Sequence, residues 1–318
     1  MSAVSGREID FRPPVAPEVS QPVPTPAKRR RRIRPLRVLR YALLIALAII
    51  FVAPFAYMVT SAFQPLEQMF RYPPQWIPTN PTTENFTGFL TSDRPVGRWV
   101  FNSLFVSITT VTLQTFYSSL IAYTFAKRRF PLRDVFFFMG LAVMMIPLEV
   151  MLIPQYLIWK HMPLFGGNDI FGQGGQGWLD SFWPLIVPSI GSPFTIFLLR
   201  QYMKTIPDSL LDAARIDGAG HFKIYWKIVM PLSRPALAAT AIFAFQGVWE
   251  GLYIPLIVLS SPALYTLPLG LTLFVIQNRT VWNLVMAGSV LATIPMIVIF
   301  LVLQKYFVSG ISLSGMKE

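Results

Sequence analysis

Two glutamates that interrupt long apolar stretches, Glu149 and Glu250, are the residues best placed for polar chemistry away from water. A charge in hydrocarbon costs about 2.5–3.5 kcal/mol on insertion scales, so both carboxylates should face a bundle interior or water. In one interpretation they bind substrate hydroxyls, while Trp249 and Tyr253 stack on the face of a sugar. In the other interpretation, each carboxylate hydrogen-bonds to backbone groups that a break in its helix leaves unpaired, or it contacts a partner subunit. Proton coupling is a third interpretation, but the sequence contains nothing that resembles a proton relay.

The sequence offers no convincing set of catalytic or metal-binding residues. It contains no cysteine, which excludes disulfides, thiolate metal ligands and thiol catalysis. The two histidines, His161 and His221, lie far apart in the sequence, which argues against a histidine metal site. No Gly-x-x-x-x-Gly-Lys-Ser/Thr phosphate loop occurs, so any ATP would have to be hydrolysed on another chain. We therefore predict no enzyme activity, no metal and no cofactor for this chain.

The composition is that of an integral membrane protein. Of the 318 residues, 53% are hydrophobic and 13% are charged, whereas a soluble domain carries roughly 25% charged residues. Six stretches reach the length of about 20 mostly apolar residues that crosses a bilayer. We predict an all-α fold with six transmembrane helices at Tyr41–Phe63, Trp99–Phe125, Val135–Trp159, Phe182–Leu199, Ala236–Leu259 and Val285–Phe307.

The basic residues predict the orientation of these spans. With the N-terminus inside, 22 of the 27 Lys and Arg lie on the inner side, and such an excess marks the cytoplasm. Both termini and the segment 203–235 are therefore expected to be cytoplasmic. Residues 1–37 are proline-rich and polybasic and should form a disordered tail whose Lys28–Arg32 run contacts anionic lipid rather than nucleic acid. Residues 38–318 should form the six-helix transmembrane domain.

The segment between spans four and five carries the most specific pattern. A helix should begin after Pro207, and Gly218 can end it about two turns later in a left-handed conformation. Because an isolated helix needs about 12–15 residues for stability, this short one should dock on a partner. Its expected small apolar face consists of Leu210, Leu211 and Ala214, and the Ala213-Ala214 pair should let a partner approach the backbone closely. A second helix after Gly220 should lie at the membrane interface on a face made of Phe222, Tyr225, Trp226 and Val229.

The spacing in this segment resembles the EAA signature of ABC importer permeases. The matching positions, with Asp for the common Glu and Met for the common Leu, are Asp212, Ala213, Ala214, Gly218, Ile228, Met230 and Pro231. Further matches from Tyr41 onward, among them Asn102-Ser103 and Ile153-Pro154-Gln155, make the chain similar to the shorter membrane subunit of maltose-type sugar permeases. It departs from that family at Glu250, where Asn is usual, and in a long glycine-rich loop at 166–177.

This resemblance implies a type I ABC importer permease fold and a multi-pass location in a bacterial or archaeal plasma membrane. It also implies four kinds of partner: a second, different permease subunit, two ATP-binding subunits, an extracytoplasmic solute-binding protein and a sugar substrate. The residues expected to couple the chain to the ATPases are Asp212, Ala213, Ala214, Asp217, Gly218, Ile228 and Pro231. The residues expected to line the translocation pathway are Glu149, Trp249, Glu250 and Tyr253.

Other functional classes fit the sequence less well. A polyol or glycerol-phosphate importer subunit is the nearest alternative, but a phosphate would favour Arg or Lys in the pathway, and none lies in the middle of a span. A stand-alone secondary transporter should show an internal repeat, which we do not see. A membrane enzyme would need the catalytic set that is missing.

Overall fold

The computed structural model describes residues 35–275 and 280–314, with side chains described over 39–275 and 280–306. Within these ranges every regular element is a helix. Four helical stretches are long and apolar enough to span a membrane, and two bent helix pairs raise the number to six. The all-α membrane fold is thus confirmed, and the predicted six spans are the upper end of this count. The predicted tail falls outside the described residues, apart from its last three positions.

The long helices are α1 (Pro35–Ala62), α4 (Val96–Lys127), α6 (Leu148–Lys160), α8 (Pro193–Lys204), α12 (Arg234–Trp249) and α15 (Trp282–Ser314). The shorter α-helices are α2 (Leu66–Met69), α3 (Glu84–Leu90), α5 (Arg133–Val143), α7 (Trp183–Ile186), α9 (Asp208–Ile216), α10 (His221–Ile224), α11 (Met230–Leu232), α13 (Tyr253–Val258) and α14 (Leu267–Thr272). Two 3-10 helices, η1 (Val187–Ser189) and η3 (Pro262–Leu264), and one π-helix, η2 (Tyr225–Val229), complete the described elements.

The chain divides into two units whose boundary lies inside α1, between Phe51 and Val52. In the first unit the structure describes the helical residues 35–51, which are rich in Leu, Ile and Ala. The second unit begins at Val52 and contains all three hydrophobic clusters and the candidate sites described below.

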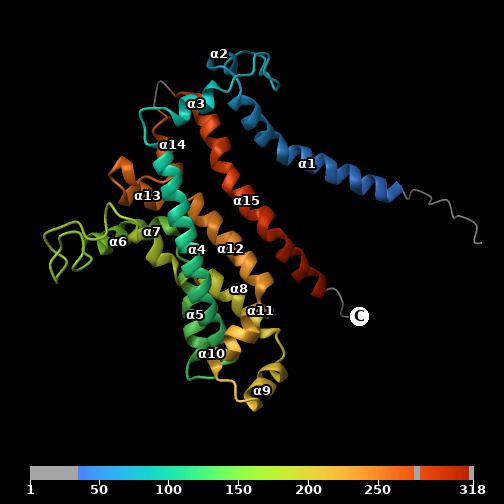
Figure 1. Ribbon diagram of the computed structural model, residues 1–318, viewed down its shortest axis with the longest axis vertical. Helices are drawn as coiled ribbons and strands as arrows, with labels where there is room; N and C mark the ends of the chain where they lie inside the picture. The colour runs from blue at the N-terminus through green and yellow to red at the C-terminus, as the bar shows by residue number, and fades with distance from the viewer. Residues whose placement is uncertain (1–34, 276–279, 315–318) are drawn as a thin grey trace, which may run out of the picture. The chain divides into compact units, whose positions relative to one another are not determined.

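In the second unit α4 runs through the helix bundle, with α8 and α12 packed against it and α15 packed against α12 (Figure 1). Polar side chains on α4 connect it to its neighbours. Gln114 Nε2 donates to Thr195 Oγ1 of α8 at 2.7 Å, and the hydroxyls of Ser119 and Tyr225 lie 2.7 Å apart. A polar side chain in a membrane bundle usually finds its partner on a neighbouring helix, so these bonds help to fix the packing of α4. Helix α9 lies at one end of the bundle, and α2 and α3 lie at the other (Figure 1).

The first turns of α4 hold the segment that precedes α14. Trp99 Nε1 donates to the carbonyl oxygen of Pro262 at 2.7 Å, and Asn102 Nδ2 donates to that of Tyr265 at 3.0 Å. Ser103 Oγ accepts from the backbone N–H of Leu267 at 2.7 Å. The Asn102-Ser103 pair, which the sequence marked only through a resemblance, therefore satisfies backbone groups that a membrane interior would leave unpaired.

Two predicted spans are interrupted. The third consists of α5 and α6, which meet at 100°, and the break falls at Pro147, whose ring disfavours a helical residue before it. The predicted fifth span, Ala236–Leu259, is wrong in its second half, because α12 ends at Trp249 and α13 is a separate short helix. Gly251 and Pro255 follow this end, and both oppose a continuous helix.

Candidate functional site

Helix α9 has the boundaries that its local sequence predicts. It begins at Asp208 after Pro207 and ends at Ile216. Gly218 has a φ of 76°, and two hydrogen bonds close the turn: Gly218 N to Arg215 O at 3.0 Å and Ala219 N to Ala214 O at 2.9 Å. This pair of bonds defines a Schellman motif, which requires a left-handed residue at the position of Gly218. The prediction for the end of α9 is confirmed.

One face of α9 is anchored to the bundle. Leu211 is 1% exposed, and Ala214 packs against the same cluster as Leu199, Met203 and Tyr225. At the start of the helix, Lys127 Nζ lies 2.7 Å from Asp208 Oδ1. The hydrogen bond from Lys127 is the main reason that the pKa of Asp208 lies below its usual range, so this carboxylate stays ionised at neutral pH.

The other face of α9 is exposed. Ile216 is 87% exposed, and Leu210, Ala213 and Asp212 are also exposed, with Asp212 Oδ1 accepting from Arg215 Nη1 at 2.7 Å. The predicted docking face of Leu210, Leu211 and Ala214 is therefore divided, because Leu211 and Ala214 pack in the chain's own core while Leu210 is exposed. An exposed, apolar and charged helix surface remains on the outer side.

The helix after Gly220 also differs from its prediction. Tyr225 and Val229 are buried, whereas Phe222 and Trp226 are exposed and stack on each other with ring planes 11° apart. The π-helical turn at η2 changes the angular spacing of these residues. The four residues predicted to share one face therefore lie on two sides of the helix. Of the remaining motif residues, Asp217 and Pro231 are exposed and Ile228 is half-buried.

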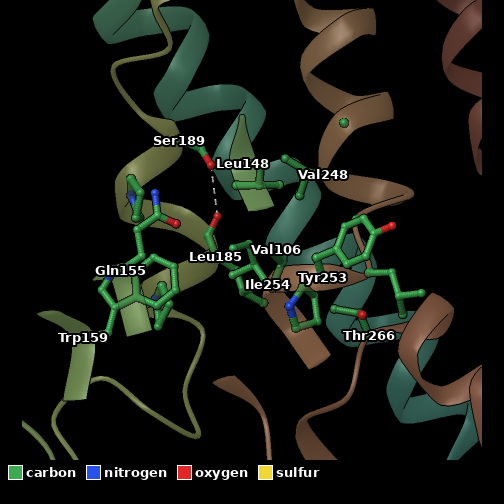
Figure 2. Close-up of a pocket in the computed structure, with 16 residues that line it drawn as sticks. Val106, Leu148, Gln155, Trp159, Leu185, Ser189, Val248, Tyr253, Ile254 and Thr266 are labelled. Atoms are coloured by element: carbon green, nitrogen blue, oxygen red, sulfur yellow. Dashed lines mark hydrogen bonds between the residues drawn. The ribbon is translucent and has the colours of Figure 1, made fainter. Parts of the chain in front are cut away.

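A cavity of about 290 Å³ lies between α6, α7, α12 and α13. In Figure 2 Gln155 and Trp159 lie on one side of it, and Tyr253 and Thr266 lie on the other. Thr266 is 5% exposed, and its hydroxyl has no hydrogen-bond partner in the described structure. None of the described residues that line the cavity carries a formal charge. Its polar groups are therefore amide and hydroxyl groups that can bind a neutral polar molecule.

The structure separates the four predicted pathway residues. Tyr253 lines the cavity. Glu149 and Glu250 are exposed next to the lining residues Leu148 and Gly251, and the carboxylate of Glu250 accepts from Gln246 Nε2 at 3.5 Å. Trp249 is instead a core residue: it is 3% exposed, stacks on Phe245 and donates to the carbonyl oxygen of Ala292 at 2.8 Å.

The sequence interpretation missed three polar lining residues, Gln155, Ser189 and Thr266. Gln155 belongs to the Ile153-Pro154-Gln155 stretch that resembles maltose-type sugar permeases, so this resemblance could have pointed to it. Ser189 and Thr266 lie near the ends of short helices far apart in the chain, and their approach depends on tertiary packing alone.

Asp180 fixes the loop that follows α13 at the edge of the cavity. Its Oδ1 accepts from the backbone N–H groups of Ser260 and Ser261 at 2.9 and 2.8 Å, and its own N–H donates to Val258 O at 2.7 Å. Burial alone would raise the pKa of Asp180, but the hydrogen bonds from Ser261 and Ser260 outweigh it and hold the pKa below its usual range. The ionised carboxylate thus ties the loop after α6 to the loop after α13.

The bundle, the cavity and the exposed helix at its basic end together define a membrane-spanning subunit of a transporter. Residues 114–313 match the family model described as the binding-protein-dependent transport system inner membrane component. The chain belongs to this family and is a multi-pass permease of the inner membrane.

Named relatives agree with this assignment. The arabinooligosaccharides transport system permease protein AraQ of Bacillus subtilis is 36% identical over 234 residues, which cover 74% of this chain and 78% of that protein. The sn-glycerol-3-phosphate transport system permease protein UgpE of Rhizobium meliloti is 31% identical over 87% of this chain and 97% of that protein. A solved bacterial ABC transporter involved in import of the acidic polysaccharide alginate shares the fold. Its TM-score is 0.71 at 22% identity, covering 86% of this chain and 97% of the solved chain. The type I ABC importer permease fold is confirmed.

Proposed function

We propose that this chain forms half of the pathway by which an ABC importer carries a sugar or oligosaccharide, with α9 coupling it to ATPase subunits. The observation that carries the proposal is α9 itself: a short helix whose inner face is anchored and whose outer face, with Ile216 87% exposed, is left for a partner. A helix that binds in a groove of another protein has such an exposed face for its partner. The ATPase subunits would number two, and the other partners would be a different permease subunit and an extracytoplasmic solute-binding protein.

The coupling is mechanical. Closure of the ATPase dimer would move the groove that holds α9, and Leu211 and Ala214 would transmit the movement into the cluster that contains Met203 of α8 and Val229 of η2. The hydrogen bond between Tyr225 and Ser119 extends the contact to α4. Movement of packed helices as rigid bodies can then alternate access to the pathway.

The cavity supports a neutral substrate. Its polar lining groups are the Gln155 amide and the hydroxyls of Ser189, Tyr253 and Thr266, beside the indole of Trp159. Hydroxyl-rich ligands are bound by groups of this kind, whereas a phosphate is usually met by Arg or Lys. The permease AraQ, whose name gives oligosaccharides as its cargo, therefore fits this lining better than UgpE, whose name gives glycerol 3-phosphate.

An acidic substitution in the exposed face of α9 tests the docking. In Ile216→Asp, a second carboxylate beside Asp217 should abolish co-purification of the ATPase from membranes, while the partner permease is retained. The matched control is Ile77→Asp, since Ile77 is 80% exposed in a different loop and should leave the complex intact. Mass spectrometry of the co-purified subunits gives the readout. A wild-type chain that purifies alone, or an ATPase that stays with Ile216→Asp, would contradict the proposal.

Removal of one hydroxyl tests the pathway. Thr266→Val keeps the shape of the side chain, and the loss of one substrate hydrogen bond of about 0.5–1.5 kcal/mol should raise KM for oligosaccharide uptake about 2–10-fold. Thr110→Val is the control, because Thr110 is equally buried with an unpartnered hydroxyl but lines none of the described cavities. Vesicle uptake of an arabinooligosaccharide and of glycerol 3-phosphate gives the readout. Uptake of glycerol 3-phosphate alone would replace the sugar proposal with the phosphate alternative.

A further inference from the structure

We propose that the bend between residues 221–232 and α12 binds the headgroup of an anionic phospholipid, with an acyl chain in the adjoining groove. The two helical segments meet at 78°, so the first lies across the direction of α12. A cavity of about 370 Å³ opens at this bend, and its lining consists of Trp226, Lys227, Met230, Pro231, Arg234 and Leu237. Two cations, an indole and apolar side chains therefore meet at one end of a spanning helix.

The charge at the bend is uncompensated. Lys227 and Arg234 are exposed, and neither makes an ion pair within the described part of the chain. Basic pockets between membrane helices on the cytoplasmic side bind anionic lipid headgroups. Trp226 is exposed and stacks on Phe222, and exposed indoles at a helix end are typical of the headgroup layer. Charge complementarity thus favours a phosphate-bearing lipid as the occupant.

An apolar groove continues from this cavity. A second cavity of about 340 Å³ shares Arg234 and Leu237 with the first and is otherwise lined by Thr115, Ala238, Ala241, Leu303 and Tyr306. Its walls come from α4, α12 and α15, and the alanines leave room for a hydrocarbon chain. The Thr115 hydroxyl is buried at this wall and has no hydrogen-bond partner in the described structure. Headgroup and acyl-chain sites are therefore joined at Arg234.

Loss of the two cations is the first test. The full chain, with any co-purifying subunits, is compared by native mass spectrometry for retention of phosphatidylglycerol and of phosphatidylcholine with identical acyl chains. Wild type should retain phosphatidylglycerol preferentially. Lys227→Gln with Arg234→Gln should weaken this binding roughly 30-fold, since each cation near an anionic membrane surface contributes about fivefold. The exchange Lys227→Arg with Arg234→Lys should preserve it.

A matched loss of charge separates a site from general attraction. Lys204→Gln with Lys223→Gln removes the same charge from exposed positions that line neither cavity, and should change retention less than about twofold. An equal loss in both double variants would overturn the proposal, and so would equal retention of the two lipids by wild type. The second result would also be expected if a helix of this or another chain, rather than lipid, filled the groove.

The acyl-chain site has its own test. Ala241→Phe should fill the groove and reduce retention of long-chain phosphatidylglycerol, while binding of its short-chain dihexanoyl form is unchanged. Inorganic phosphate should not compete at the same concentration if the ligand is a lipid. Displacement of long-chain lipid by inorganic phosphate, or no effect of Ala241→Phe, would overturn the assignment to a phospholipid. These measurements do not involve an ATPase or a sugar, so their failure is distinguishable from failure of the proposed transport function.

Discussion

Gly218→Val should leave the chain folded in the membrane while reducing substrate uptake about 5–30-fold. The φ of 76° at Gly218 is a left-handed conformation that costs a residue with a side chain roughly 1–2 kcal/mol, and every 1.4 kcal/mol corresponds to a tenfold change in binding. The Schellman hydrogen bonds would weaken, and the end of α9 that presents Ile216 would lose its fixed direction. Uptake and ATPase stimulation, measured on equal amounts of membrane protein, check this result.

The matched control for this substitution is Gly220→Val. Gly220 has a φ of −68° and ψ of 162°, which any residue adopts, and no atom lies within 4 Å of a Cβ built there. The control should therefore retain most of the uptake. If Gly218→Val transported normally, or if both variants failed equally, the geometry at the end of α9 would not be what couples this segment to its partner.

Helix α9 could be predicted from sequence because its boundaries depend on local residues. Pro207 favours a helix start directly after it, and Gly218 supplies the left-handed residue at the end, so neither boundary needs a distant contact. The face that α9 turns inward could not be predicted, since it is decided by the cluster of α4, α8 and η2 against which Leu211 packs.

The residues that line the cavity, in contrast to the boundaries of α9, could not be predicted from the local sequence. An acid next to a tryptophan in an apolar stretch is compatible with a substrate site, yet Trp249 packs in the core and the polar groups of the cavity come from four separate elements. Nothing in the local sequence distinguishes a ring that stacks on substrate from one that stacks on Phe245. The cavity arises because α12 ends at Trp249 and α6 turns away from α5, and both events depend on packing as well as on Gly and Pro.

Gly270→Ala should destabilise the bundle by about 1–3 kcal/mol, the usual cost of overpacking a filled core. A Cβ built on Gly270 would overlap the indole of Trp99, which is fully buried and donates to Pro262 O. Either the indole or α14 must shift, and a shift of α14 would displace Thr266 at its start from the cavity wall. We therefore expect a lower midpoint of thermal unfolding together with reduced uptake.

Two further variants separate this clash from a general effect of adding a methyl group. Gly97→Ala, on α4 where no atom lies within 4 Å of a built Cβ, should be neutral or slightly stabilising, because alanine favours the helix over glycine. Combining Gly270→Ala with Trp99→Phe should cost less than the sum of the two single changes, since the smaller ring leaves space for the methyl group. Strict additivity in this double-mutant cycle would show that the two residues are not in contact. In that case α14 would have to be held by Asn102 and Ser103 through their hydrogen bonds to residues 263–267 rather than by the fit of Gly270 to the indole.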